Sequence, residues 1–325
     1  MKKISIVIPC YNEQDNVQPI CAAVCDVLKE SLPKYDYEIL LIDNKSKDNT
    51  RARIRELCSE NTHIKAIFNI KNFGQFNSPY YALCQASGDC VVLLCADFQD
   101  PVELIPSMVQ KWEEGAKVIC MIKKSSKENA LIYFARSVYY KMIKAMSEIN
   151  QIEHFTGFGL YDKSFIELLR TLKDPTPFLR GIVAEYAPDH VEIPYEQQKR
   201  KAGKTKNNFF SLFDAAMLSF TSYTKGGLRL ATFSGFFISG ISFAVAMVYL
   251  VLKLVFWNRF IAGNAPILIG VFFLGGIQLF FIGLLGEYIM SMNTRIINRP
   301  LVVEEKRLNF DDSGNKKSTE KSSDE

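Results

Sequence analysis

Four short apolar segments in the first hundred residues each end in a cluster of polar side chains. The clusters are PCYNE after the first segment, DNKSKDNT after the second, NIKNFGQ after the third and CADFQD after the fourth. Asp43 closes the second segment and Asp97 the fourth, with Gln99 and Asp100 directly beyond Asp97. Each acid taken alone is as compatible with a helix N-cap as with ligand binding. Their recurrence beside Glu13 and Gln99 favours a single ligand-binding site.

The stretch Cys95–Pro101 (CADFQDP) bears directly on metal binding. An Asp-x-Asp pair at the end of a strand would hold a divalent cation and a nucleotide-sugar, but Cys95 occupies the first position of the pair. A thiolate is a soft ligand that matches Mg²⁺ poorly, so we interpret Cys95 as a packing residue at the strand end. Asp97 and Gln99 are left as oxygen ligands for Mg²⁺ or Mn²⁺, and Mg²⁺ often keeps few protein ligands.

The elements that must position these clusters alternate along the chain between strand-like and helix-like patterns. The expected strands are 4–9, 37–43, 64–70 and 90–97, and the expected helices are 17–32, 50–58 and 78–86. Continuous apolar strands separated by helices are typical of an α/β fold with a mostly parallel sheet covered on both faces. Ligands bind such sheets at the carboxyl ends of the strands, where all four clusters would meet. Neither G-x-G-x-x-G nor G-x-x-x-x-G-K-[ST] occurs, which argues against a dinucleotide or ATP held by a glycine-rich loop.

Composition argues against several other classes of protein. The net charge of +4 over 325 residues lacks the broad basic character of a nucleic-acid binder, so we expect no nucleic-acid partner. Eight cysteines all lie in the first half, without a C-x-x-C spacing or a paired Cys/His framework, which argues against a zinc site. This usage favours a reduced, cytoplasmic location for that half. The opening apolar run is too short for a signal peptide.

The last third of the chain has the composition of a membrane protein. Residues 231–255 and 265–290 are almost entirely apolar, and each stretch exceeds the roughly 20 residues that cross a bilayer as a helix. Basic residues concentrate outside this pair of spans. They are Lys199, Arg200, Lys201, Lys204, Lys206, Lys225 and Arg229 before the first span, and Arg295, Arg299, Lys306 and Arg307 after the second. The positive-inside rule therefore places both ends, and the N-terminal half, in the cytoplasm.

These patterns divide the chain into four parts. Residues 1–206 form the α/β domain, 207–229 a juxtamembrane segment, 230–292 the pair of transmembrane helices, and 293–325 a cytoplasmic end that is disordered from about 311. Apolar residues at helical spacing in 207–223 fit an amphipathic helix in the membrane interface, and equally a helix packed on the α/β domain. Gly275, Gly276 and Gly283 would allow close helix packing, including that of a homo-oligomer.

The motifs resemble those of glycosyltransferase family 2 in order and spacing. The matching stretches are Ser5–Glu13, Leu40–Thr50, Lys71–Gln75 and Ala96–Pro101. Three later stretches, together with the predicted pair of transmembrane helices, resemble the polyprenyl-phosphate glycosyltransferase branch of that family. They are Gly157–Leu169, Phe178–Tyr186 and Lys199–Ala216. The resemblance covers nearly the whole chain except the final tail, and it implies a Rossmann-type sheet of the GT-A kind.

The resemblance also implies an activity and a set of residue roles. A membrane-anchored, inverting enzyme at the inner (plasma) membrane would transfer a sugar from a UDP- or GDP-sugar to a polyprenyl (undecaprenyl or dolichyl) phosphate. The donor nucleotide would be held by the residues that match the family's first motifs, which are Pro9, Tyr11, Glu13 and Asp43. Asp97 and Gln99 would hold Mg²⁺ or Mn²⁺. Asn44 stands where the family usually has a second Asp.

Binding of the acceptor phosphate and the donor diphosphate requires basic side chains. The candidates are Arg136, Arg180, Arg200 and Lys204, because guanidinium groups in particular match phosphate oxygens. Asp100 would steer the acceptor or act as a base, or would instead cap the helix that begins with PVELI.

Two alternatives to this activity remain open. The first is extension of a glycolipid or polysaccharide, although the Gln-x-x-Arg-Trp motif of processive synthases is absent. The second is a non-catalytic homologue that binds nucleotide or lipid, which the departures at Cys95 and Asn44 suggest.

Overall fold

The computed structural model describes residues 1–124, 152–198, 200, 214, 217–222, 226–255 and 264–310. The chain divides into two compact units. The sheet unit comprises Met1–Asn129, Gln151–Lys206 and Asn298–Glu325, and the helical unit comprises Ala130–Asn150 and Asn207–Ile297.

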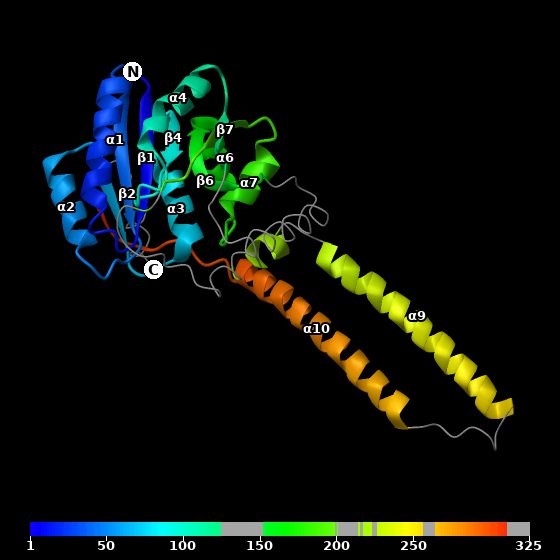
Figure 1. Ribbon diagram of the computed structural model, residues 1–325. Helices are drawn as coiled ribbons and strands as arrows, with labels where there is room; N and C mark the ends of the chain where they lie inside the picture. Colours follow the sequence, from blue (N-terminus) through cyan, green and yellow to red (C-terminus); the bar gives the residue numbers. More distant parts are fainter. Residues whose placement is uncertain are drawn as a thin grey trace, which may run out of the picture. The chain divides into compact units, whose positions relative to one another are not determined.

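An eight-stranded sheet in the order β7-β5-β6-β4-β1-β2-β3-β8 forms the centre of the sheet unit (Figure 1). The strands are β1 Lys3–Cys10, β2 Asp36–Asp43, β3 Ile64–Asn69, β4 Cys90–Leu93, β5 Val118–Lys123, β6 Phe155–Asp162, β7 Val191–Tyr195 and β8 Glu304–Leu308. The block β4-β1-β2-β3 is parallel throughout. β6 runs antiparallel to β4 and β5, and β8 runs antiparallel to β3. The sheet is therefore mixed, although its first four strands in the chain form the expected parallel block.

Helices cover both faces of the sheet, as the apolar strands predicted. They are α1 Val17–Ser31, α2 Thr50–Glu60, α3 Gly74–Gln85, α4 Ile105–Glu113, α6 Lys163–Thr171 and α7 Leu179–Tyr186. Side chains of α1, α2 and α4 share one buried apolar cluster with the sheet. Side chains of α3, α6 and α7 share a second cluster that contains Val7, Leu40 and Ile42. Successive strand residues point to opposite faces, so strands that are apolar on both faces supply both clusters.

The fourth strand ends earlier than expected, and this changes the setting of the metal motif. β4 stops at Leu93, whereas the apolar pattern extends the strand to Asp97. Leu94 and Ala96 remain buried beyond the end of the strand. Asp97 therefore lies in a loop, and the loop's Phe98 has a φ of 60°, in the left-handed region.

The chain returns to the sheet after the helical unit, which the sequence analysis did not predict. β8 pairs with β3 and lies within residues 293–325, expected above only as a cytoplasmic end. Asn309, just beyond β8, donates its side-chain amide to the carbonyl oxygens of Cys58 and Ile64 at 2.7 and 2.8 Å. The C-terminal strand is thus fastened to α2 and β3.

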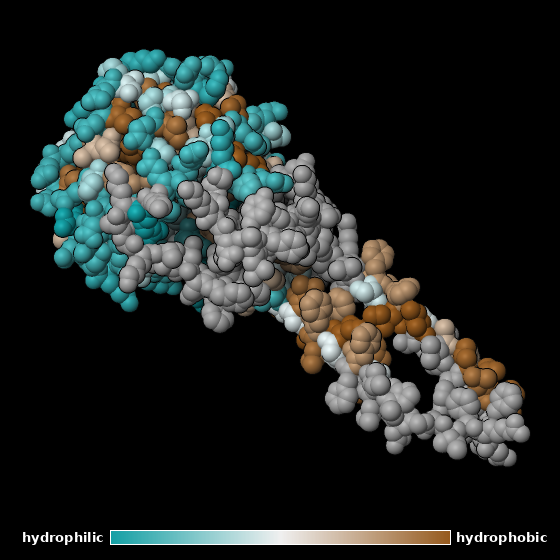
Figure 2. Space-filling model, in the orientation of Figure 1, coloured by the Kyte–Doolittle hydropathy of each residue, from teal (hydrophilic) through white to brown (hydrophobic). Residues whose placement is uncertain are grey.

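The helical unit contains two long helices, α9 Gly226–Val255 and α10 Asn264–Ile297 (Figure 1). In the described part of the chain, one stretch, Phe273–Ile297, is long and apolar enough to cross a membrane. Its apolar side chains are not buried in the protein, and Figure 2 shows hydrophobic residues along these helices. Residues 217–222 are helical, and the Ser222 hydroxyl accepts a hydrogen bond from Arg295 at 2.9 Å. The pair of spans at 231–255 and 265–290 stays a prediction.

Candidate functional site

The loops at the carboxyl ends of β1 and β2 are joined to each other by hydrogen bonds. The register pairs Cys10 at the end of β1 with Asp43 at the end of β2. The Asn12 backbone N–H donates to Ser46 Oγ at 2.9 Å, and the Glu13 N–H donates to Thr50 Oγ1 at 2.8 Å. The sheet thus brings the predicted residues Pro9, Tyr11, Glu13 and Asp43 to one edge, as expected for parallel strands.

Asp43 is fully buried and holds the loop that follows β2. Its carboxylate accepts hydrogen bonds from the backbone N–H groups of Lys45 and Ser46 at 3.2 Å each, and Arg51 Nε lies 3.0 Å from Oδ2. Burial raises the pKa of Asp43, while the bonds from Ser46 oppose that shift. These contacts fix the loop on which the donor nucleotide is expected to bind.

Asn44 connects the β2 loop with the loop after β3, which accounts for its departure from the family pattern. Its Nδ2 donates to Asn72 Oδ1 and to the Gly74 carbonyl at 2.9 and 3.0 Å. Its Oδ1 accepts from Asn69 Nδ2 at 3.1 Å and from the Phe73 N–H at 2.8 Å. An aspartate could accept these bonds but could not donate, so the amide suits this position.

The loop after β4 contains Asp97, Gln99 and Asp100, the three residues predicted to act in catalysis. Asp97 is 7% exposed, and its Oδ1 accepts a hydrogen bond from the Gln99 N–H at 3.1 Å. Its Oδ2 forms an ion pair with Arg200 at 2.8 Å. Arg200 thus reaches the predicted metal loop, and a guanidinium there could also meet a diphosphate.

Cys95 does not have the packing role that the sequence suggested. Of the eight cysteines, Cys95 alone is exposed, so that interpretation is wrong. The Cys95 backbone N–H donates to Asp100 Oδ2 at 3.2 Å. Its side chain also forms a hydrogen bond with Asp100, so both the backbone and the thiol of Cys95 contact this carboxylate.

Asp100 is buried and serves to tie elements together. Tyr195, at the end of β7, donates its hydroxyl to Asp100 Oδ1 at 3.0 Å. Burial raises the pKa of Asp100. Beside this pair, the Gln198 N–H donates to the Gln99 carbonyl at 3.1 Å. The segment that follows β7 therefore lies along the loop that contains Asp97, and Asp100 positions this loop.

Three further basic residues, Arg180, Arg136 and Lys204, were also predicted to bind phosphate. Arg180 lies in α7, with its guanidinium carbon 5.5 Å from the centroid of the Phe178 ring. Arg136 and Lys204 lie outside the described residues. The phosphate-binding roles of these side chains stay predictions.

A divalent cation would find few protein ligands at the loop after β4. The described residues contain no group of three or more His, Cys, Asp or Glu side chains able to hold a metal. Asp97 and Gln99 offer one carboxylate and one amide oxygen, which fits Mg²⁺ or Mn²⁺ bound mainly through donor phosphates and water. The donor set is thus compatible with a cation that arrives with its phosphorylated ligand.

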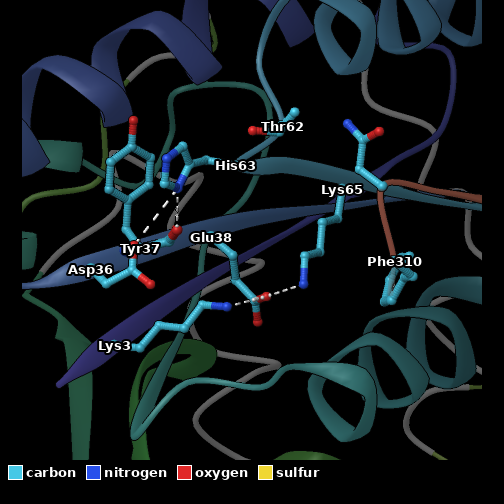
Figure 3. Close-up of a pocket in the computed structure, with 9 residues that line it drawn as sticks. Lys3, Asp36, Tyr37, Glu38, Thr62, His63, Lys65 and Phe310 are labelled. Atoms are coloured by element: carbon cyan, nitrogen blue, oxygen red, sulfur yellow. Dashed lines mark hydrogen bonds and ion pairs between the residues drawn. The ribbon is translucent and has the colours of Figure 1, made fainter. Parts of the chain in front are cut away.

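A pocket of ≈ 380 Å³ lies at the opposite edge of the sheet, where β1, β2 and β3 begin (Figure 3). It is lined by Lys3, Asp36, Tyr37, Glu38, Thr62, His63, Lys65, Asn309 and Phe310. Glu38 Oε2 lies 3.0 Å from Lys3 Nζ and 2.9 Å from Lys65 Nζ, and the carboxylates of Glu38 and Asp36 balance the two ammonium charges. This arrangement stabilises the sheet and leaves no charge excess that would attract a phosphorylated ligand.

Three residues of the candidate site gave no signal in the sequence. They are Arg51, Tyr195 and Glu305. Tyr195 and Glu305 come from elements that the apolar pattern did not predict, and Arg51 resembles any basic residue on an exposed helix. Only tertiary contacts identify them.

We expect Tyr195→Phe to lower the free energy of unfolding by about 2 kcal/mol, because a hydrogen bond to a buried carboxyl group is lost. Thermal melting of the full-length protein in detergent would measure the loss. Tyr186→Phe removes a hydroxyl from a residue that is 44% exposed and serves as the control. Equal melting temperatures for the two variants would contradict a tie between β7 and Asp100.

Comparisons of the sequence and of the structure find several known proteins to which this chain is similar. The family model Glycosyl transferase family 2 matches residues 5–169. A bactoprenol glucosyl transferase of Shigella phage SfII is 31% identical over 306 residues, which cover 94% of this chain and 98% of the phage protein. An uncharacterized glycosyltransferase of Synechocystis sp. is 31% identical over 92% of this chain and 93% of its own length. Among solved structures, glucosyl-3-phosphoglycerate synthase from Mycobacterium tuberculosis, with Mn²⁺, UDP-glucose and phosphoglyceric acid, matches with a TM-score of 0.47 and 17% identity. The match covers 68% of this chain and 78% of that one.

Proposed function

The chain belongs to glycosyltransferase family 2, and from this premise we propose that it transfers a sugar from a nucleotide-diphosphate donor to a polyprenyl phosphate. The observation that carries the proposal is the length of the match. Relatives named bactoprenol glucosyl transferase align with more than nine tenths of this chain, including the helical unit as well as the sheet unit. A shared membrane-type unit favours a lipid acceptor over a soluble one.

In this proposal the donor lies across the carboxyl ends of β1, β2 and β4. The loops with Pro9, Tyr11 and Glu13 hold the base and ribose together with Asp43. Asp97 and Gln99 would hold a divalent cation, which would supply positive charge to neutralise the leaving diphosphate. The burial of Asp97 supports this role, because a carboxylate in a low-dielectric setting interacts more strongly with charge.

The acceptor phosphate carries its own nucleophilic oxygen, so a dedicated general base is not required. That oxygen attacks C1 of the sugar, the bond between C1 and the diphosphate oxygen breaks, and the bonding electrons leave with the nucleotide diphosphate. Attack from the side opposite the leaving group inverts the anomeric centre. Arg200 and Arg180 align the phosphates, together with Arg136 and Lys204. Asp100, tied to Tyr195 and the Cys95 N–H, positions the loop.

We also propose that the helical unit anchors the enzyme in the inner (plasma) membrane. The two spans are residues 231–255 and 265–290, preceded by the interfacial segment 207–229, and domain 1–206 faces the cytoplasm. The exposed apolar side chains of α9 and α10, such as Phe236 at 74% and Leu279 at 72%, support this arrangement, because lipid would cover them. A lipid acceptor would then meet the site at the membrane surface.

A panel of donors tests the proposed function. Full-length protein in detergent would be incubated with undecaprenyl phosphate, Mn²⁺ and radiolabelled UDP- and GDP-sugars, and lipid-linked product would be separated by chromatography. We expect one donor to give product, EDTA to abolish the reaction and added Mg²⁺ or Mn²⁺ to restore it. With a single carboxylate at the site, the rate should depend steeply on metal concentration. Failure of every donor would refute the proposed function, and transfer indifferent to EDTA would refute the metal site.

A further inference from the structure

We propose that Glu305, in the C-terminal strand β8, is a positioning residue for the donor-nucleotide site and acts through Arg51 on the loop after β2. This inference rests on the proposed function, because the loop is taken to hold the nucleotide. Glu305 contacts neither the donor nor the metal in this account. It orients the side chains that hold Asp43.

An irregularity in the sheet directs Glu305 towards this loop. Phe68 pairs with Lys306 and the next residue, Asn69, pairs with Glu304, so Glu305 is an extra residue in β8. Such a β-bulge turns a side chain away from the direction that regular alternation would give it, and bulges are frequent beside active sites. The neighbouring Glu304 instead accepts a hydrogen bond from the Tyr81 hydroxyl of α3 at 2.8 Å.

Glu305 joins two basic side chains that belong to the donor loop and its helix. Its Oε2 lies 2.8 Å from Lys45 Nζ and 3.0 Å from Arg51 Nη2. Hydrogen bonds from Lys45 and Arg51 lower the pKa of Glu305 to about 2, so the carboxylate is charged at neutral pH. Lys45 has a φ of 63°, in the left-handed region, where a non-glycine residue is held only by surrounding contacts.

Arg51 carries the effect of Glu305 to the nucleotide loop. Its Nε lies 3.0 Å from Asp43 Oδ2, while Nη2 contacts Glu305, so one guanidinium is shared by two carboxylates. Its guanidinium carbon also lies 5.0 Å from the centroid of the Phe68 ring. Asp43 holds the Ser46 N–H, and Ser46 Oγ accepts from the Asn12 N–H next to Tyr11. A continuous series of polar contacts therefore runs from β8 to the loop after β1.

The exposure of the Glu305, Lys45 and Arg51 side chains indicates whether loss of Glu305 should affect nucleotide binding or folding stability. The side chains of Glu305 and Lys45 are 40% and 43% exposed, and exposed ion pairs contribute little to folding stability. Arg51 is only 15% exposed, so loss of Glu305 would change where a nearly buried guanidinium rests beside Asp43. The expected consequence is weaker nucleotide binding in a protein that is equally stable.

The test compares Glu305→Gln with Glu304→Gln, the adjacent glutamate in the same strand with different partners. Binding of UDP and of GDP, each with Mn²⁺, would be measured by calorimetry on full-length protein in detergent. For the nucleotide that the wild type binds, we expect Glu305→Gln to raise Kd about fivefold, as for residues coupled in one network. Glu304→Gln should leave Kd unchanged, Glu305→Asp should recover part of the affinity, and both Glu305 variants should melt like the wild type. In the assay, KM for the donor should rise while kcat and KM for the lipid stay constant.

A double-mutant cycle shows whether Glu305 acts through Arg51. If it does, Glu305→Gln should have no further effect on Kd once Arg51→Gln is present. Full additivity of the two substitutions, or an unchanged Kd in Glu305→Gln, would overturn the inference alone. A wild-type protein that binds neither UDP nor GDP would overturn the proposed function as well.

Discussion

Asp97→Asn is expected to lower kcat for sugar transfer by about 10²–10³-fold, the usual cost of removing one group that stabilises developing charge. The amide keeps the shape of the side chain and its bond from the Gln99 N–H, but it cannot neutralise a cation. Because Cys95 replaces the first acid of the usual pair, Asp100 is the other acid of this loop, and its carboxylate is already bound to Tyr195. The measurement is kcat with the donor identified by the panel, at saturating Mn²⁺.

Cys95→Ser is the matched control for this substitution. It changes the adjacent exposed side chain of the same loop and leaves the backbone bond to Asp100 in place, so kcat should change little. If Asp97→Asn keeps its activity, the metal does not bind at Asp97, and the predicted metal site is wrong. An inactive wild type whose cellular phenotype survives Asp97→Asn would favour the non-catalytic homologue.

Glu38→Gln is expected to lower the free energy of unfolding by about 3 kcal/mol, because two ammonium groups lose their shared partner. Glu38 is 2% exposed and accepts bonds from Ser5 Oγ and Ser87 Oγ at 2.6 and 2.8 Å, besides its contacts with Lys3 and Lys65. The variant therefore leaves several donors facing an amide at the amino edge of the sheet.

The loss should depend on pH in a defined direction. Although burial alone would raise the pKa of Glu38, bonds from Ser5, Ser87 and the two lysines lower it to about 2, from an ordinary 4.5. The ionised carboxylate therefore stabilises the fold fully above pH 4.5, and this contribution disappears as the pH falls towards 2. Melting curves of wild type and Glu38→Gln in detergent should differ at pH 7 and converge in acid. Glu60→Gln, at an exposed position, is the control, and a constant difference at all pH values would contradict the assignment.

The sequence was sufficient to predict the parallel part of the sheet. The first four strands and α1, α2 and α3 were identified because continuous apolar runs alternate with helical patterns. Their polar ends identified Asp43, Asp97 and Gln99 as neighbours of one sheet edge. The end of β4 was placed four residues too late, because Leu94 and Ala96 are buried without belonging to a strand.

The partners of those residues could not be predicted, for a physical reason. β6, β7 and β8 join the sheet through pairings that depend on residues far away in the chain, and no local pattern encodes such a pairing. Glu305 lies 254 positions from Arg51, and Tyr195 lies 95 from Asp100. The residue types in the sequence identified candidate ligand-binding side chains. The contacts that position those side chains are set by the tertiary structure.

The two edges of the sheet also bear on how the protein avoids aggregation. β8 occupies the outer side of β3 and satisfies backbone groups that could otherwise recruit a strand from another molecule. At the other end, β7 contains Pro194, which has no N–H to offer, and the exposed Glu192. In the described sheet, β8 is itself the second edge strand, and its charged residues Glu304–Arg307 make it poorly suited to add a strand. In the membrane-anchored arrangement proposed above, such edge strands would matter because neighbouring copies on one surface meet often.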